Sequence, residues 1–491
     1  MMMQSKRRVV TAVTLAMCFA FFTVFFTKIH PIVLFDTDSW YYAYYHRHAW
    51  PIWHFWNPTR VFPEVFMPAV SQFSAHVIYP VTGDYFFSLT IGYAVSVSAA
   101  VTLLTWMVMR HFQREGSSPL ESVGITLLFL ICHFLILRSE DNFNRYMLLT
   151  ENTCTHFYYV IPNLLNCTLV LWVADDPELR RFFSKGYSMR KAFFLLLAYF
   201  CAFSNLWASM IGGIYAGVAL LIALIATKKD KKSWLRDTLK ENSGLLLLLA
   251  LWALAQLFEF NGRRAAQIKN LNFSETVQTT LAAAKPVLFS VSHTFRWMAA
   301  ILLVGGIGIT LWKKRWNETA SVLWALIAVP FTAIYLLLSC AVCAPGYITR
   351  PDTFYGLFFF GMLILLVLFR QIIRHLPRIR IVVPLLLVIL AFECNTADVT
   401  YRNSMYFNLP AQTCYKVDND ILRQLQGAVE AGKKKTVLYV PQFDVEKNWP
   451  LATYANKRIP LHLYKMGLLE RNIKVKEIIP TKDKNEEFHI D

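Results

Sequence analysis

The first apolar run of the chain covers residues 9–27 and reads VVTAVTLAMCFAFFTVFFT, and residues 35–56 then read FDTDSWYYAYYHRHAWPIWHFW. A helix built from the first stretch is close to the length needed to cross the roughly 30 Å hydrocarbon core of a bilayer. The second stretch combines two carboxylates, Asp36 and Asp38, with many Trp, Tyr and His residues. Aromatic side chains with polar tips concentrate at the membrane–water interface. The two stretches together predict a transmembrane helix followed by an interfacial segment.

Apolar runs of this kind recur along the chain. Of the 491 residues, 56% are hydrophobic, 15% are aromatic and only 16% are charged. A soluble protein of this size would carry far more charge on its surface. The composition therefore predicts an all-α polytopic membrane protein with about eleven transmembrane helices. The predicted segments are 9–27, 85–109, 120–137, 157–174, 192–206, 209–227, 244–260, 295–312, 320–340, 355–373 and 379–394.

Residues 192–227 leave two interpretations open. Asn205 and Trp207 lie near the middle of this stretch. A polar break inside a membrane helix and a tight turn between two helices both fit the pattern.

The formal net charge of +17 reflects topology in this interpretation rather than nucleic-acid binding. Most loop Lys and Arg residues fall in alternate short loops, as the positive-inside rule expects. This asymmetry predicts a cytoplasmic N-terminus and a C-terminus on the opposite side of the membrane. No basic stripe with DNA-reading geometry is present, so we expect no nucleic-acid partner.

The outer side of the membrane carries most of the polar material. The transmembrane domain is predicted over residues 1–394, and its first outer loop, 28–84, is much longer than a connection requires. Two interfacial helices are expected in that loop, near 39–56 and near 66–80. After Cys394 the composition becomes polar, which predicts a small α/β domain over residues 395–491.

Asp36 and Asp38 are candidate catalytic groups. A carboxylate at a membrane boundary can take a proton from a hydroxyl group while that oxygen attacks a sugar carbon. The Asp-Thr-Asp spacing also suits a divalent cation with oxygen ligands. Alternatively, the aspartates cap a helix that begins near Ser39.

Arg60 and Glu64 follow in the same loop. The planar guanidinium of arginine suits a phosphate or a carboxylate. Glu64 either orients Arg60, acts catalytically itself, or forms a purely structural pair with the arginine.

Further cations are predicted on the outer side, where a lipid phosphate would need one nearby. Each of them alone could simply face lipid headgroups, but we expect one or two to bind phosphate. These candidates are Arg138, Arg145, Arg263, Arg264 and Arg350.

The sequence resembles the GT-C class of membrane glycosyltransferases, and within it the phage-type serotype-converting O-antigen glucosyltransferases (Gtr type). The matching pieces are the Asp-Thr-Asp-Ser-Trp-Tyr motif at residues 36–41, the Trp56 to Glu64 segment, and LYKMGLLERNIKVKEI in the tail at residues 463–478. The resemblance implies a bacterial inner-membrane enzyme that works on the periplasmic side. Its donor would be a sugar on undecaprenyl phosphate, its acceptor an O-antigen or other lipid-linked glycan of lipopolysaccharide, and its transfer inverting.

By the same resemblance, Asp36 or Asp38 is the base and an outer arginine holds the phosphate. Trp40 and Tyr41 are further substrate-binding candidates, since aromatic rings can stack on sugars. No cofactor is implied, and a divalent cation is not expected although the Asp-Thr-Asp motif leaves one open.

Two other functions compete with this one. A lipid-linked glycan flippase would use many helices and outer arginines, but it gives the outer carboxylates and the α/β tail no task. An O-antigen ligase or polymerase also uses outer arginines, but typically places them with a large loop late in the chain.

Overall fold

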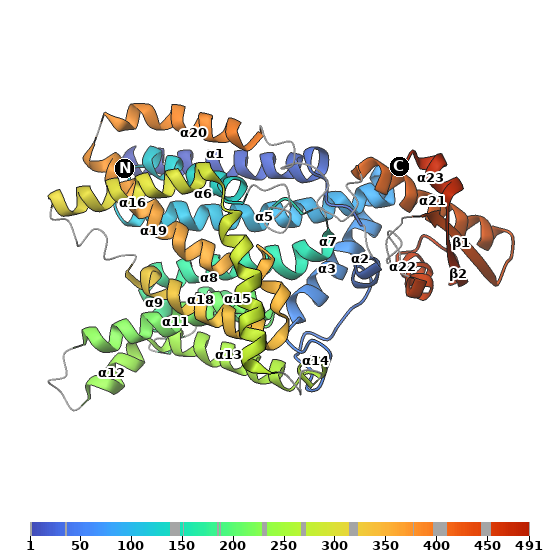
Figure 1. Ribbon diagram of the computed structural model, residues 1–491, viewed down its shortest axis with the longest axis horizontal. Helices are drawn as coiled ribbons and strands as arrows, with labels where there is room; N and C mark the ends of the chain where they lie inside the picture. Colours follow the sequence, from blue (N-terminus) through green and yellow to red (C-terminus); the bar gives the residue numbers. More distant parts are fainter. Residues whose placement is uncertain are drawn as a thin grey trace.

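The computed structural model in Figure 1 shows a helical bundle with a small domain at one end. We call this end of the bundle the domain end and the opposite end the basic end, after the Lys and Arg residues of its loops. The described residues are 2–34, 37–137, 148–150, 152–183, 186, 188–227, 233–266, 272–313, 323–376, 378–395, 410–442 and 453–490. Asp36, Arg138 and Arg145 lie outside them.

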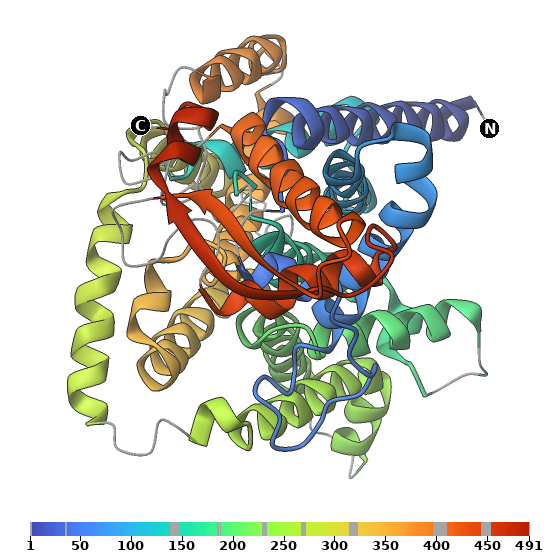
Figure 2. The ribbon, with the colours of Figure 1, turned by 90° about the vertical axis from the view of Figure 1, so that its right-hand side faces the viewer.

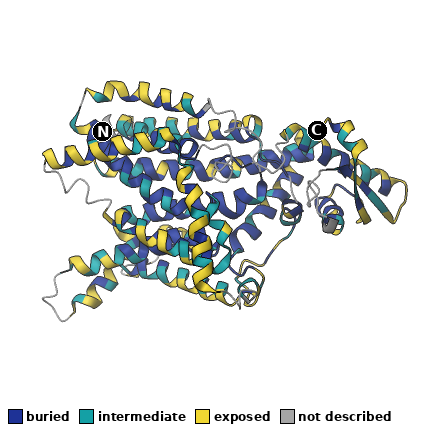
Figure 3. Cartoon of the chain, viewed as in Figure 1, coloured by how far each residue is buried: buried dark blue, intermediate teal, exposed yellow. Residues whose placement is uncertain are grey.

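Eight helices of the described chain are long and apolar enough to cross a membrane. The first of them has only 22% of its apolar window buried, so its Val, Met and Phe side chains face outward, as a lipid-facing helix requires. Figure 3 shows exposed residues along the outer helices and buried ones in the central helices. The spans are α1 continuing into η1 (Lys6–Ile29), α5 (Tyr85–Arg114), α7–η4–α8 (Thr153–Asp175), α11 (Leu206–Ala226), α13 (Ser243–Phe260), α16 (His293–Lys313), α18 (Leu323–Cys343) and α19 (Tyr355–His375).

Three shorter helices occupy the remaining predicted segments: α6 (Pro119–Leu135), α10 (Met189–Ala202) and α20 (Ile379–Asn395). The count of eleven crossings therefore stays a prediction, whereas a largely helical chain with several membrane-length helices is confirmed. Short helices in the connections are α9 (Pro177–Arg180), α12 (Trp234–Glu241), α14 (Arg263–Ala266) and the 3₁₀ turn η6 (Pro345–Thr349).

Residues 189–226 form two helices rather than one broken helix. Asn205 separates them and caps α11, because its side-chain oxygen accepts a hydrogen bond from the backbone N–H of Trp207 at 2.8 Å. Its amide nitrogen donates to the backbone carbonyl of Tyr158, also at 2.8 Å. The polar residue at the break therefore satisfies backbone groups of two neighbouring elements.

The first outer loop differs from its prediction in one half. A helix near 66–80 is confirmed and starts earlier, running through α3 (Val61–Phe73), η2 (Ser74–Ile78) and α4 (Tyr79–Thr82). The helix predicted over 39–56 is wrong, because α2 covers only Thr37–Tyr42. Pro51 disfavours helical geometry at the residue before it.

Residues 43–60 instead form an irregular segment held by backbone contacts. The Ala49 carbonyl accepts a hydrogen bond from the Tyr199 hydroxyl at 2.6 Å. The Phe55 carbonyl accepts one from the backbone N–H of Arg263 at 2.9 Å. These contacts fix the segment across the ends of α10 and α13 that lie at the domain end.

Helix α15 (Phe273–Phe289) crosses the bundle steeply instead of running along it (Figures 1 and 2). One face, with the buried residues Thr280 and Val287, packs against α18 and η6. Leu281 and Leu288 are exposed on a second face. Glu275, on a third face, is also exposed. A helix with a protein-facing, an apolar and a polar face is suited to lie in the plane of the membrane interface.

The small C-terminal domain contains a parallel two-stranded sheet, as expected from the alternation of helix and strand patterns. Figure 2 views this domain end-on, with the two strands crossing in front of the bundle. Its elements are α21 (Ala411–Glu430), β1 (Lys435–Pro441), η7 (Thr453–Lys457), α22 (Arg458–Lys465), β2 (Lys474–Thr481) and α23 (Lys482–Phe488).

His462 joins this domain to the bundle. Its ring is fully buried, and its Nδ1 lies 2.9 Å from the Trp40 carbonyl oxygen while its Nε2 lies 2.7 Å from the Tyr85 hydroxyl. A second contact pairs the hydroxyls of Tyr415 and Thr90 at 2.6 Å. The C-terminal domain is thus hydrogen-bonded to both the first loop and α5.

Candidate functional site

Three arginines gather around Tyr347 at the domain end. Arg264, from α14, donates a hydrogen bond to the Tyr347 hydroxyl at 3.2 Å. The Arg350 guanidinium lies over the Tyr347 ring, 5.1 Å from its centre. Burial alone would raise the pKa of Tyr347, but the hydrogen bond from Arg264 and the charges of Arg264, Arg60 and Arg350 lower it. The lowered pKa records a positive electrostatic potential at this point.

Arg60 supplies a second cation, which lies against aromatic rings. Its guanidinium lies 5.2 Å from the centre of the Tyr158 ring. Within the described ranges it forms no ion pair. Arg60 is half-buried, and Tyr42, Tyr158 and Tyr159 lie close enough to act on it electrostatically. A cation held among rings without a counter-ion is well suited to receive an anion.

Arg350, in contrast, is held in a fixed orientation. Its Nε and Nη2 donate to the two carboxylate oxygens of Asp352 at 3.1 and 2.6 Å. Asp352 is buried, and its backbone carbonyl accepts a hydrogen bond from Asn163 at 2.8 Å. The Trp207 ring stacks on Tyr347, with ring centres 4.8 Å apart. Arg350 and Tyr347 are therefore rigidly placed, a requirement for a preorganised binding site.

Glu64 faces a different arginine from the one expected. Arg47 lies 3.2 Å from Glu64 Oε2, and both side chains are almost completely buried. Arg47 also donates to the carbonyl oxygens of Asn57 and Pro58 at 2.8 and 2.6 Å. An ion pair between Arg60 and Glu64, one of the alternatives left open by the sequence, does not form among the described residues, and Glu64 pairs with Arg47 instead. Pairing with Arg47 explains why Arg60 keeps its charge available.

The Glu64 carboxyl group is poised for proton transfer near neutral pH. Burial raises the pKa of Glu64 to about 7, although Arg47 and Arg60 act in the opposite direction. A carboxyl group with this pKa can hold or release a proton at physiological pH. The Glu64 carboxyl group and the Arg60 guanidinium also lie close enough to act on each other electrostatically.

Asp38 lies at the open side of the same region. Its carboxylate is 3.5 Å from Arg458 of α22, and its side chain is 63% exposed. The ring of Tyr42 connects the two halves of the site, because Arg60, Glu64 and Asp38 all act electrostatically on its hydroxyl. The site thus combines the carboxylates of Asp38 and Glu64 with Arg60 and Arg264, two cations that form no ion pair with the described residues.

The other predicted residues lie elsewhere. Trp40 is fully buried against His462 and Phe86. Tyr41 lies under the Arg458 guanidinium, 4.4 Å from the ring centre. Arg263 is exposed next to Arg264. Among the described residues, no contact joins Arg263 to Tyr347.

Four residues of the site were missed by the sequence analysis. Arg47 lies in the irregular segment, Tyr347 and Asp352 flank Arg350, and Arg458 belongs to the C-terminal domain. The run Tyr-Ile-Thr-Arg-Pro-Asp at residues 347–352 could have indicated the Arg350–Asp352 pair by its spacing.

No group of three or more His, Cys, Asp or Glu side chains is arranged to hold a metal ion in the described part of the chain. Asp36, one half of the Asp-Thr-Asp motif, lies outside that part, so the expectation about metals stays a prediction. Comparison with family models, curated protein sequences and solved structures gives no match. The chemistry is therefore argued from the residues themselves.

Proposed function

We propose that the protein is an inverting membrane glycosyltransferase of the GT-C type, which moves a sugar from a polyprenyl-phosphate carrier to a glycan acceptor. A sugar such as glucose and an acceptor such as O-antigen fit the resemblance of the Asp-Thr-Asp and tail motifs. We place the reaction on the periplasmic side of a bacterial inner membrane. The observation that carries the proposal is that Arg60 and Arg264 both act on Tyr347, while Arg60 also acts on the buried carboxyl group of Glu64.

The chemistry of such a transfer needs both kinds of group. The acceptor hydroxyl oxygen attacks the anomeric carbon while the bond from that carbon to the phosphate oxygen breaks. A carboxylate takes the hydroxyl proton, and the electron pair leaves with polyprenyl phosphate. Positive charge near the departing phosphate stabilises the transition state most where water is excluded.

The residues divide naturally between these roles. Arg60 and Arg264 would hold the phosphate, and Arg350, oriented by Asp352, would add to the positive potential. Asp36 or Asp38 would act as the base, as the resemblance suggests. Glu64 is the third candidate, because its pKa of about 7 suits a group that accepts a proton at neutral pH.

Transfer by the full-length protein in lipid vesicles tests the proposal. Polyprenyl-phosphate glucose and lipopolysaccharide serve as substrates, and release of polyprenyl phosphate is measured. We expect Arg60→Gln and Arg264→Gln each to lower the rate by about 10²-fold, the usual cost of losing one such contact. The matched control is Arg263→Gln, which changes the neighbouring exposed arginine and should leave the rate within about twofold.

Replacing each carboxylate separately identifies the base. Asp36→Asn, Asp38→Asn and Glu64→Gln each keep the size of the side chain. The variant that abolishes transfer while the protein still binds the donor has lost the base. If all three retain full activity, the proposed mechanism is wrong.

The flippase alternative predicts another outcome. A flippase would move a lipid-linked glycan between leaflets without releasing polyprenyl phosphate. Movement of a fluorescent lipid-linked glycan, unaffected by the carboxylate variants and unaccompanied by release, would favour that function. A ligase or polymerase would instead release polyprenyl diphosphate from a diphosphate-linked glycan.

A further inference from the structure

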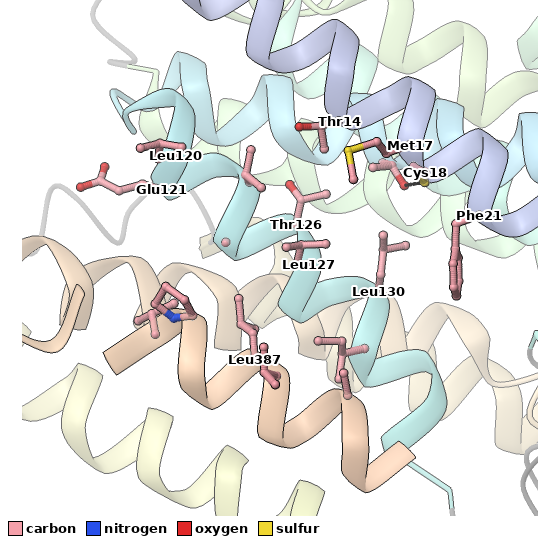
Figure 4. A pocket seen from close by; sticks show the side chains of 18 of the residues that line it. Thr14, Met17, Cys18, Phe21, Leu120, Glu121, Thr126, Leu127, Leu130 and Leu387 are labelled. Atoms are coloured by element: carbon pink, nitrogen blue, oxygen red, sulfur yellow. Dashed lines mark hydrogen bonds between the residues drawn. The ribbon is translucent and has the colours of Figure 1, made fainter. Parts of the chain in front are cut away.

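A large apolar cavity lies far from the site described above, between α1, α6 and α20. It has a volume of about 1000 Å³. Figure 4 shows Met17 and Cys18 of α1 on one side, Leu387 of α20 on the other, and Leu127 and Leu130 of α6 between them. Both α1 and α20 pack against α6, whose side chains form the floor of the cavity.

The cavity opens toward the surroundings of the bundle. Met17, at its edge, is 68% exposed, and Val388 across from it is 50% exposed. Met17 lies on a candidate membrane span and Val388 lies on α20, whose exposed side chains include several apolar ones, so we expect the opening to face the hydrocarbon region. An apolar cavity of this size on a lipid-facing surface is suited to hydrocarbon chains.

The charged residues described as lining the cavity lie at its basic end. Glu121 and Arg380 are the two charged residues among those described as lining it, and their side chains pair at 2.9 Å. Phe25 and Phe134 line the opposite end. A ligand with hydrocarbon chains and a polar head would therefore place its head at the basic end.

Positive charge predominates around that mouth. Arg374, Arg378 and Arg380 are all exposed in or beside the α19–α20 turn. Arg7 of α1 binds Gln113 at the same end, with Nε 3.0 Å from Oε1. Glu121 and Glu115 are the nearest acidic residues of the described α5–α6 turn. The surplus of arginine favours an anionic headgroup.

We propose that this cavity binds an anionic glycerophospholipid, with its chains between α1, α6 and α20 and its phosphate at the arginines of the basic end. The donor of the proposed transfer would not fit the same place. Its phosphate belongs beside Arg60 and Arg264 at the domain end, so the two sites would face opposite leaflets. The lipid is a bound component of the fold and the inference does not depend on the transfer reaction.

Lipid retention tests this directly. The full-length protein is stripped of lipid in detergent, incubated with phosphatidylglycerol or phosphatidylcholine, and examined by native mass spectrometry. We expect preferential retention of phosphatidylglycerol. Arg378→Gln should weaken it about fivefold, the effect of one arginine near an anionic headgroup.

A variant that fills the cavity provides a second test of lipid binding. Gly124 of α6 lines the cavity, and an added Cβ would meet only Val383, at 3.8 Å, so Gly124→Leu has room to occupy the chain site. The matched control is Gly308→Leu in α16, where a Cβ would meet nothing within 4 Å. Gly124→Leu should lose the bound lipid, and Gly308→Leu should keep it.

Several outcomes would overturn the proposal. Equal retention of phosphatidylglycerol and phosphatidylcholine would show that the arginines do not select an anionic headgroup. Equal loss of bound lipid in Gly124→Leu and Gly308→Leu would show that the lipid is not held in the cavity. Displacement of phosphatidylglycerol by polyprenyl phosphate would assign the cavity to the donor. If Gly124→Leu fails to fold, the exposed Arg378→Gln variant still decides the case.

Discussion

Acid should loosen the C-terminal domain through a single buried ring. The Trp40 carbonyl can only accept a hydrogen bond, so His462 must donate to it from Nδ1–H and accept from the Tyr85 hydroxyl at Nε2. This is the neutral form of the ring. Burial lowers the pKa of His462 to about 4, from the 6.5 of an exposed histidine.

The lowered pKa of His462 determines the direction and size of the change in docking stability with pH. Between pH 6.5 and 4 the undocked state binds more protons than the docked state, so docking loses stability as the pH falls. At pH 5 the two pKa values imply a loss of about 2 kcal/mol, or about thirtyfold in the equilibrium for opening. Above pH 7.5 the contribution of the ring is complete.

Hydrogen exchange of α22 measures this opening. Wild type and His462→Gln are compared at pH 7.5 and pH 5, so that intrinsic exchange rates cancel at each pH. We expect wild-type α22 to lose about thirtyfold protection at pH 5 relative to pH 7.5, while the glutamine variant, which cannot be protonated, loses little. Equal losses in the two proteins would refute the reasoning, because another group would then be responsible.

Three further changes test other parts of the molecule. If Glu64 is the base, the transfer rate should rise with pH through about 7, and Glu64→Gln should remove that rise in a pH–rate profile. Gly213→Ala should lower thermal stability by about 1–3 kcal/mol, because the added Cβ would lie 2.4 Å from the Trp252 ring, whereas Gly217→Ala, with 3.7 Å to its nearest neighbour, should be nearly neutral. Asn205→Ala should cost about 1 kcal/mol of stability through the lost helix cap, measured by the same thermal unfolding.

Much of the architecture could be predicted because it depends on local composition. Apolar runs predict helices of membrane length. A polar residue inside one of these runs, Asn205, indicates the break before α11. The α/β domain follows from the change of composition after Cys394. The helix predicted over 39–56 does not form, because Trp, Tyr and His are weak helix formers and Pro51 disfavours helical geometry before it. Arg47 instead binds loop carbonyls.

The types of residue in the site could be predicted from the sequence, but the ion pairs that they form could not. Arg60, Arg264 and Arg350 were expected near a phosphate, and the structure brings them together around Tyr347. That Glu64 pairs with Arg47 could not be inferred, because four-residue spacing favours Arg60 only if both residues lie in one helix. Arg60 precedes the first residue of α3, so the geometry that would have joined the two is absent.

Helix α15 connects a face suited to the membrane interface with the arginine cluster. One face of this helix packs on η6, which carries Tyr347, and η6 ends next to Arg350. A mismatch between hydrocarbon thickness and protein length costs fractions of a kcal/mol per Å. We expect a helix at the interface to pass part of that load to the 3₁₀ turn, so that membrane thickness would become a physical variable of the site.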